Sequence, residues 1–248
     1  NDGALTPQLE PLLIGQVGGA THILPADLNG DATMDLVVVG VGSSFEGSKL
    51  VWYHNNGAST PYFSRRDISD LHHRPVATSA ADLDRDGDLD LLLVDRSLDQ
   101  LWFYDNLGGS EPRFFGTLVA DNLDGAVDVT SGDLDRDGDL DIVAAAENSD
   151  DVIWYENSGS RPPSFNAHII RFAATPPSSS QMDYARTIDL GDMNGDGWLD
   201  VTYGSDLDGE VGWYENNRAL FPAFTNHLVT TEMEAVKSVA VADVDHDG

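Results

Sequence analysis

Two repeated sequence elements, together with a lack of helical periodicity, predict an all-β chain: a β-propeller of four-stranded antiparallel blades. The first element is an acidic loop with Asp at positions 1 and 5, Asp or Asn at position 3 and Asp at position 9. The second is an aromatic run ending in Tyr, a polar residue and Asn. From copy to copy the first Asp of the loop advances by 55, 51, 59 and 51 residues, and the Tyr advances by 51, 51 and 59. Matching steps in two separate elements indicate a true repeat, of the length found in solenoids and propellers.

Each repeat divides into four short strands, taken in order along the chain. The first strand precedes the acidic loop, as in residues 76–80, and the second follows it as an aliphatic run such as 91–94. A turn then leads to a third strand that carries the aromatic element, and a fourth strand begins at a Pro-x-aromatic sequence. The aliphatic runs are typical of strands buried on both faces, which suits the middle strands of a blade. A β-sandwich is the less favoured alternative, because it would not show a repeat of this length.

The spacing also predicts where the repeats begin and end. Four full repeats are expected over 18–70, 74–120, 125–172 and 184–230, with 1–14 as the outer strand of a preceding blade and 235–248 as the start of a fifth repeat. Four blades alone would leave open sheet edges, which are an aggregation liability. We therefore expect a fragment of a larger ring, whose remainder or a partner chain covers those edges.

The acidic loops indicate a bound metal. They hold 19 of the 43 acidic residues, and carboxylates this close together repel one another unless a cation lies between them. Oxygen ligands at positions 1, 3 and 5, followed by a turn-forming Gly, resemble the first half of an EF-hand loop, where the position 7 carbonyl adds a ligand. Such all-oxygen ligation favours Ca²⁺ over Mg²⁺. A single copy could be a solvated acidic turn, but five copies in one frame predict calcium.

The predicted ligands are the side chains at positions 1, 3, 5 and 9 and the carbonyl at position 7. Position 9 is expected to close the site as a bidentate ligand, because position 12, the bidentate Glu of an EF-hand, is apolar here. Four to five Ca²⁺ are expected, about one for each complete loop; Ala32 replaces the Gly of the first loop and the fifth is incomplete. The ligand sets are Asp27, Asn29, Asp31, Thr33 and Asp35; Asp82, Asp84, Asp86, Asp88 and Asp90; Asp133, Asp135, Asp137, Asp139 and Asp141; Asp192, Asn194, Asp196, Trp198 and Asp200; and Asp243, Asp245 and Asp247.

Composition excludes several classes of protein. The formal net charge of −30 over 248 residues argues against binding to nucleic acid or to an anionic membrane, since both need a basic surface. No apolar run approaches the ~18 residues of a membrane-spanning helix. The absence of cysteine excludes disulfides, thiolate metal sites and cysteine nucleophiles.

The acidic loops, paired with Trp-Tyr-Glu-Asn strands, resemble the FG-GAP/VCBS-type repeats of integrin-like β-propellers. The resemblance extends over essentially the whole chain. It implies one Ca²⁺ per loop, bound between the first two strands of a blade. It also implies a ring of about seven blades and a secreted or cell-surface protein.

No catalytic constellation is evident, since the chain has no Gly-x-Ser-x-Gly, His-Glu-x-x-His or Gly-Lys-Ser/Thr sequence. The sequence predicts a non-enzymatic, calcium-stabilised extracellular module, a scaffold for adhesion, assembly or protein and glycan recognition. The insertion Ala173–Asp183 is the candidate contact loop, although a linker is an equal alternative. The alternative function is a lectin, or a polysaccharide lyase or dehydratase. A lyase would need a cationic or His/Tyr base in the central channel, for which 13 basic residues offer little material.

Overall fold

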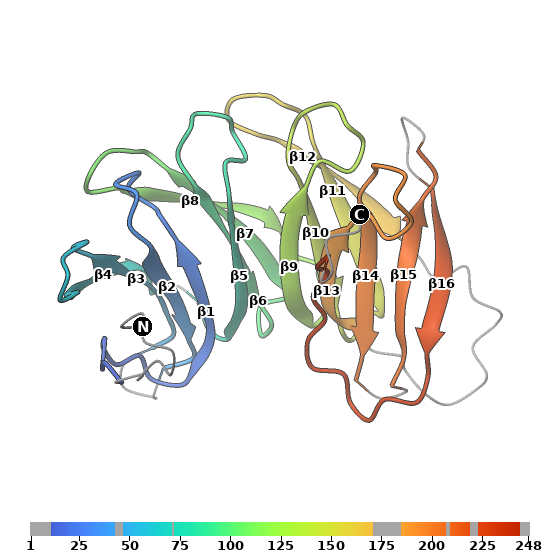
Figure 1. The fold of residues 1–248 in the computed structure, drawn as a ribbon, viewed down its shortest axis with the longest axis horizontal. Helices are drawn as coiled ribbons and strands as arrows, with labels where there is room; N and C mark the ends of the chain where they lie inside the picture. Colours follow the sequence, from blue (N-terminus) through green and yellow to red (C-terminus); the bar gives the residue numbers. More distant parts are fainter. Residues whose placement is uncertain are drawn as a thin grey trace, which may run out of the picture.

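The structure, a computed structural model, consists of four four-stranded antiparallel sheets (Figure 1). It describes residues 11–42, 47–70, 72–170, 185–206, 209–218 and 223–243. In every sheet the strands lie in the order in which they occur along the chain. No helix long and apolar enough to cross a membrane occurs in these ranges. The predicted all-β architecture of four-stranded blades is confirmed.

The strands have closely matched lengths from sheet to sheet. The first two sheets comprise β1 (Ala20–Ala26), β2 (Asp35–Gly40), β3 (Lys49–Asn55), β4 (Phe63–Ser69), β5 (Pro75–Ala81), β6 (Asp90–Asp95), β7 (Gln100–Asn106) and β8 (Phe114–Ala120). The other two comprise β9 (Ala126–Gly132), β10 (Asp141–Ala146), β11 (Asp151–Asn157), β12 (Phe165–Ile170), β13 (Ala185–Gly191), β14 (Asp200–Ser205), β15 (Val211–Asn216) and β16 (Phe224–Thr230).

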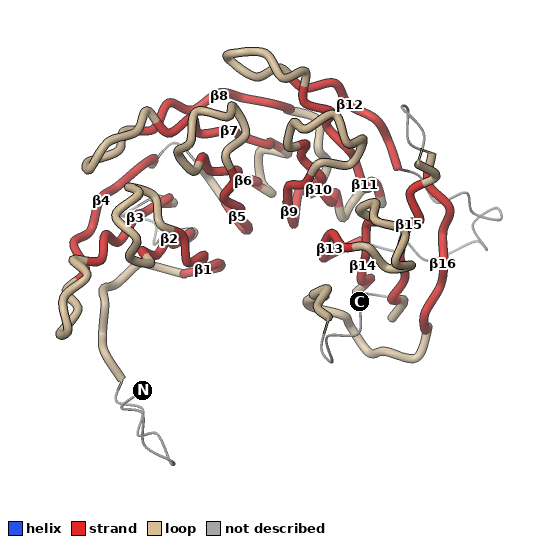
Figure 2. The backbone as a smooth tube through the Cα atoms, turned by 45° about the horizontal axis from the view of Figure 1, so that its top comes forward, coloured by secondary structure: helices blue, strands red, loops and turns tan. Residues whose placement is uncertain are grey.

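The sheets follow one another around an arc, as the blades of a propeller do. Figure 2 shows the first strand of each sheet on the inside of the arc and the fourth strand on the outside. The inner strands β1, β5, β9 and β13 contact one another in sequence, so they line the axis. Each of the four complete acidic loops joins an inner strand to the second strand of its sheet, so these loops share one end of the arc. Asp245 and Asp247 of the fifth loop lie outside the described residues.

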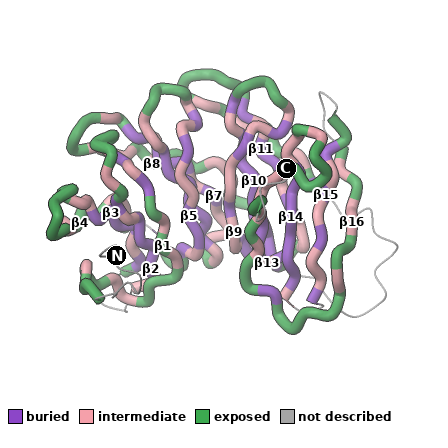
Figure 3. The backbone as a smooth tube through the Cα atoms, viewed as in Figure 1, coloured by how far each residue is buried: buried purple, intermediate pink, exposed green. Residues whose placement is uncertain are grey.

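The core lies between neighbouring blades. All residues of β6, β10 and β14 are buried, as expected for strands covered on both faces. In Figure 3 the buried residues of β14 are coloured purple. Trp52 of the first blade packs with Leu91 and Leu93 of the second, and Trp154 of the third packs with Tyr203 of the fourth. Repeated aromatic side chains thus pack between neighbouring blades. Their burial supplies much of the apolar contact that stabilises the arc.

The ends of the described chain form no regular strand. Residues 11–14 form no strand, and the rest of the predicted outer strand lies outside the described residues. Ile14 and Val17 pack instead on the open face of the first blade, against Val38 and Tyr53, because that face carries apolar side chains. Residues 235–243 likewise form no strand. The candidate contact loop, Ala173–Asp183, lies outside the described residues.

Candidate metal loops and the strands beside them

Each acidic loop is folded by bonds between its own carboxylates and backbone amides. In all four complete loops, the position 1 Oδ2 accepts the position 6 N–H over 2.6–3.1 Å. The position 3 Oδ1 accepts the position 5 N–H over 3.0–3.3 Å, and the position 5 Oδ1 accepts the position 7 N–H over 2.8–2.9 Å. These are local side-chain-to-backbone turns of the kind that Asp and Asn favour. They hold the side chains of positions 1, 3 and 5 around one centre.

The second and third loops bring carboxylates together most closely. Ligand atoms of Asp82, Asp84 and Asp86 lie within 4.8 Å of one another, and the same holds for the equivalent residues Asp133, Asp135 and Asp137. Burial, reinforced by the neighbouring carboxylates, raises the pKa of Asp84 and of Asp135. Oδ1 of Asp133 is buried without a hydrogen-bond partner. Clustered, partly desolvated carboxylates of this kind fit a hard cation held by oxygen ligands.

The first and fourth loops have the same fold with two fewer carboxylates, because Asn29 and Asn194 occupy position 3 and Thr33 and Trp198 occupy position 7. Gly197 of the fourth loop has φ 86°, but Ala32 of the first loop holds φ 65° with a Cβ atom. Ala32 still donates its N–H to Asp27 over 2.8 Å, so the first loop keeps its turns despite the substitution. A left-handed conformation is costly for Ala. The second and third loops instead hold Arg85 and Arg136 in this conformation at position 4, each with φ 60°, where the first loop has Gly30.

The position 9 aspartates are the most buried acids of the loops. Asp35, Asp90, Asp141 and Asp200 are all 0% exposed. In Asp141, Oδ1 accepts the N–H of Asn157 over 2.8 Å and Oδ2 accepts the N–H of Leu134 over 3.1 Å. These bonds tie the start of the loop to the end of the third strand. That position 9 acts as a bidentate ligand stays a prediction. It is chemically feasible because each carboxylate oxygen keeps a second lone pair for a cation.

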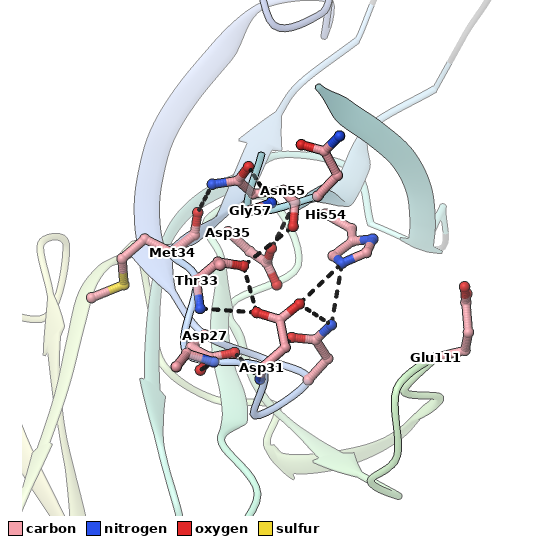
Figure 4. Close-up of polar contacts among 12 residues, drawn as sticks. Asp27, Asp31, Thr33, Met34, Asp35, His54, Asn55, Gly57 and Glu111 are labelled. Carbon is pink, nitrogen blue, oxygen red and sulfur yellow. Dashed lines mark hydrogen bonds and ion pairs between the residues drawn. The ribbon is translucent and has the colours of Figure 1, made fainter. Parts of the chain in front are cut away.

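The third strand of each blade places one further polar side chain beside position 3. His54 Nε2 lies 3.2 Å from Asn29 Nδ2 (Figure 4), and Glu215 Oε1 accepts a hydrogen bond from Asn194 Nδ2 over 3.3 Å. Asp105 and Glu156 occupy the same register position. The ligands predicted from the sequence do not include this position. The signal that identifies it is its fixed place directly after the Tyr of the aromatic element.

In the third and fourth blades this glutamate is held by a histidine of the fourth strand. His168 Nε2 lies 2.7 Å from Glu156 Oε2, and His227 Nε2 lies 2.7 Å from Glu215 Oε2. The two imidazole rings stack on Trp154 and Trp213, with centroids 4.5 Å and 4.4 Å apart. The stacked rings fix the glutamates in place next to the loops.

Neighbouring loops also contact each other through position 4. The Arg85 guanidinium forms an ion pair with Asp139, which occupies position 7 of the next loop. The Arg136 guanidinium lies over the ring of Trp198, position 7 of the following loop, 4.8 Å from the centroid. Position 7 is predicted to use only its carbonyl as a ligand, so its side chain can vary and serve these contacts between blades.

Successive four-stranded blades, each with an acidic loop between its first two strands, define a repeat protein of the β-propeller class. The FG-GAP-like repeat matches residues 27–93, 133–203 and 192–248. The matched ranges include most of the chain, and the protein belongs to the FG-GAP-like repeat family. The predicted resemblance is therefore confirmed.

Two solved structures are similar in fold. One is an Agrocybe aegerita lectin described as recognising non-reducing terminal N-acetylglucosamine, with a TM-score of 0.55 and 20% identity over 85% of this chain and 52% of the lectin. The other is the V. cholerae biofilm matrix protein Bap1, with a TM-score of 0.42 and 17% identity over 81% of this chain and 35% of Bap1. The chain thus spans about half the length of the lectin. No curated protein sequence matches significantly.

Proposed function

We propose that this chain is part of a calcium-stabilised β-propeller that acts outside the cell as a non-catalytic module for adhesion, assembly or recognition of a protein or glycan. The observation that carries the proposal is the convergence of Asp82, Asp84 and Asp86, repeated at Asp133, Asp135 and Asp137. A bound Ca²⁺ would supply the positive charge that these carboxylates lack. The fold shared with a glycan-binding lectin supports a recognition role.

The loops differ in the charge that they offer a cation. The second and third loops each carry five aspartates, whereas the first and fourth each carry three. Because affinity for Ca²⁺ depends on the number of charged ligands and on site rigidity, the second and third loops should bind most tightly. The first and fourth loops carry equal charge, but the first holds the strained Ala32 where the fourth has Gly197. The first loop should therefore bind Ca²⁺ most weakly.

The test is a thermal melt with and without chelator. We expect EDTA to lower the melting temperature sharply, Ca²⁺ to restore it, and Mg²⁺ at the same concentration to fail. Stabilisation should follow mass action, with dissociation constants of ~10⁻⁴–10⁻³ M if the module works at extracellular calcium levels. An unchanged melting curve after chelation would refute the calcium proposal. Micromolar or tighter binding at all sites would count against the extracellular one.

The non-catalytic part of the proposal is supported by the state of His22. Among the described residues that line the cavity between the inner strands, His22 is the one histidine that could act as a base. Its Nδ1 accepts the N–H of Thr78 over 2.9 Å, which leaves the proton on Nε2 and no free basic nitrogen. Burial also lowers the pKa of His22. No tyrosine lines the described part of this cavity.

The enzymatic alternative has its own measurement. Incubation with acidic polysaccharides should release no unsaturated sugar, while glycan-array binding without turnover would indicate a lectin. Accumulation of an unsaturated product would replace the non-catalytic proposal with a lyase.

A further inference from the structure

The cavity on the axis of the arc collects an unusual share of the cationic side chains. It has a volume of about 670 Å³ and is lined by residues of β1, β5, β9 and β13 and by residues 237–239. Arg74, Arg96, Arg186 and Lys237 are among the lining residues, four of the 13 basic residues in the chain. With 13 basic residues in the chain we expect little cationic material in a central channel, but four of them line this cavity.

These cations lie at the end of the inner strands opposite to the acidic loops. Arg74 immediately precedes β5 and Arg186 is the second residue of β13, whereas the acidic loops follow the far ends of the same strands. Arg96 follows β6, and its N–H donates to the carbonyl of Arg74 over 3.0 Å, which brings the two arginines to one rim. The chain thus separates its charge along the axis, with metal loops at one end and a cationic rim at the other.

Two carboxylates outside the cavity lining hold most of the rim in position. Glu147 lies 2.5 Å from Arg96 and 3.6 Å from Arg186. Asp206 lies 2.7 Å from Arg186 and 2.6 Å from Lys237. Such alternating ion pairs orient the cations before a ligand arrives, which lowers the entropic cost of binding. The Arg74 guanidinium makes no ion pair or hydrogen bond with any described residue.

Further along the inner strands the cavity presents acceptors instead of cations. Asp128 and Asp189 line it, and each anchors its carboxylate with backbone amides: Asp128 Oδ2 accepts Ile188 N–H over 3.0 Å, and Asp189 Oδ2 accepts Val241 N–H over 2.7 Å. Each oxygen keeps a second lone pair for a hydroxyl donor. A ligand that satisfies both regions carries an anionic group at one end and hydroxyl groups at the other.

We propose that the axial cavity binds an acidic saccharide, a sugar that carries a carboxylate, with the carboxylate at Arg74 and the rim and the hydroxyl groups at Asp128 and Asp189. The inference rests on the proposed recognition function and specifies its ligand. An inorganic anion would satisfy only the rim, and a neutral sugar only the acceptors. The cavity volume is within the usual range of ligand pockets, about 300–1,000 Å³. Arginine suits the task because its planar fork binds carboxylates in bidentate fashion.

The experiment titrates the calcium-saturated chain with glucuronate, with glucose as the neutral counterpart and inorganic sulfate as the simple anion. We expect glucuronate to bind at least tenfold more tightly than either. Arg74→Gln should weaken glucuronate about tenfold at an unchanged melting temperature, because this guanidinium has no partner within the described protein. Arg113→Gln, at an exposed arginine outside the cavity, is the matched control and should leave binding unchanged.

Several results would overturn the inference: no glucuronate binding, equal binding of sulfate, or an Arg74→Gln variant that binds as the wild type does. Binding of a tetraglutamate peptide in place of glucuronate would assign the cavity to acidic protein segments instead. Calcium-dependent melting measured on the same sample separates the two proposals. A chain that calcium stabilises but glucuronate does not bind retains the proposed function and loses this ligand.

Discussion

Asn157 of the third blade donates a hydrogen bond from Nδ2 to the carbonyl oxygen of Leu83, in the acidic loop of the second blade, over 2.8 Å. The same amide donates to Leu140 of its own loop over 3.0 Å. Asn106 and Asn216 make the corresponding pairs of bonds to their own and the preceding loop. Leu83 lies between two predicted ligands, so one asparagine fixes two metal loops and joins two blades.

Loss of this amide should therefore destabilise the arc. We expect Asn157→Ala to lower the free energy of unfolding by ~2–3 kcal/mol, because one buried and one partly buried carbonyl lose this donor. Asn55→Ala is the matched control, since among the described residues the Asn55 amide donates only to Met34 of its own blade, and it should cost less. Urea denaturation in saturating Ca²⁺ measures both losses. Equal losses would show that the bond between blades contributes nothing.

Removal of one ligand should remove one calcium. Asp135→Ala is expected to reduce the number of bound Ca²⁺ by one, because position 3 then offers no oxygen. Asp135→Asn should only weaken that site, since Asn29 and Asn194 stand at position 3 in other loops. Calorimetric titration gives the stoichiometry, with Asp121→Asn, at an exposed acid outside the loops, as the control. Unchanged stoichiometry in Asp135→Ala would argue against the predicted ligand set.

The strain at Ala32 predicts a substitution that raises the stability of the chain instead of lowering it. Ala32→Gly should stabilise the chain by ~1 kcal/mol, because glycine adopts φ near 65° without the steric cost of a Cβ atom. Ala58→Gly, at an exposed site without positive φ, should instead be neutral or destabilising. Thermal melts with calcium compare the variants. A destabilised Ala32→Gly would mean that the Ala32 methyl group makes a stabilising contact.

The sequence was sufficient to predict the parts that repeat. Elements that recur in the same order in each copy specify the strands and the acidic loops, since local turn chemistry and periodicity decide them. The axial rim was missed because Arg74 and Arg96 come from turns at different places in the repeat, and only the curvature of the arc brings them to Arg186. The backbone bonds of Asp141 were missed for a related reason, because register across two strands, not spacing, pairs it with Asn157.

The third-strand glutamate should tune the loop beside it. Glu215 accepts a hydrogen bond from Asn194 Nδ2, which turns the amide oxygen of Asn194 toward the loop centre. We expect Glu215→Gln to weaken calcium binding at the fourth loop about tenfold, as the loss of other hydrogen-bonded supports of metal ligands does. Glu232→Gln, at an exposed glutamate after β16, is the control. If the calcium affinity of the fourth loop is unaltered in Glu215→Gln, Glu215 does not support the ligand Asn194.

The buried position 9 aspartates make the stability of the metal-free chain depend on pH. Burial raises the pKa of Asp90 and of Asp141 to about 7, although backbone amide bonds act in the other direction. An unfolded Asp has a pKa of about 3.9, so the folded chain binds these protons more tightly.

The stability that these protons contribute is present at acid pH and is lost as pH rises from about 4 through about 7. In EDTA we therefore expect a lower melting temperature at about pH 8 than at about pH 5.5. Asp141→Asn should flatten the slope, because an amide does not titrate, and saturating Ca²⁺ should reduce it by stabilising the charged carboxylates. Melts followed by circular dichroism across this range measure the slope. A metal-free chain that becomes more stable toward pH 8 would show that the amide bonds outweigh the cost of burial.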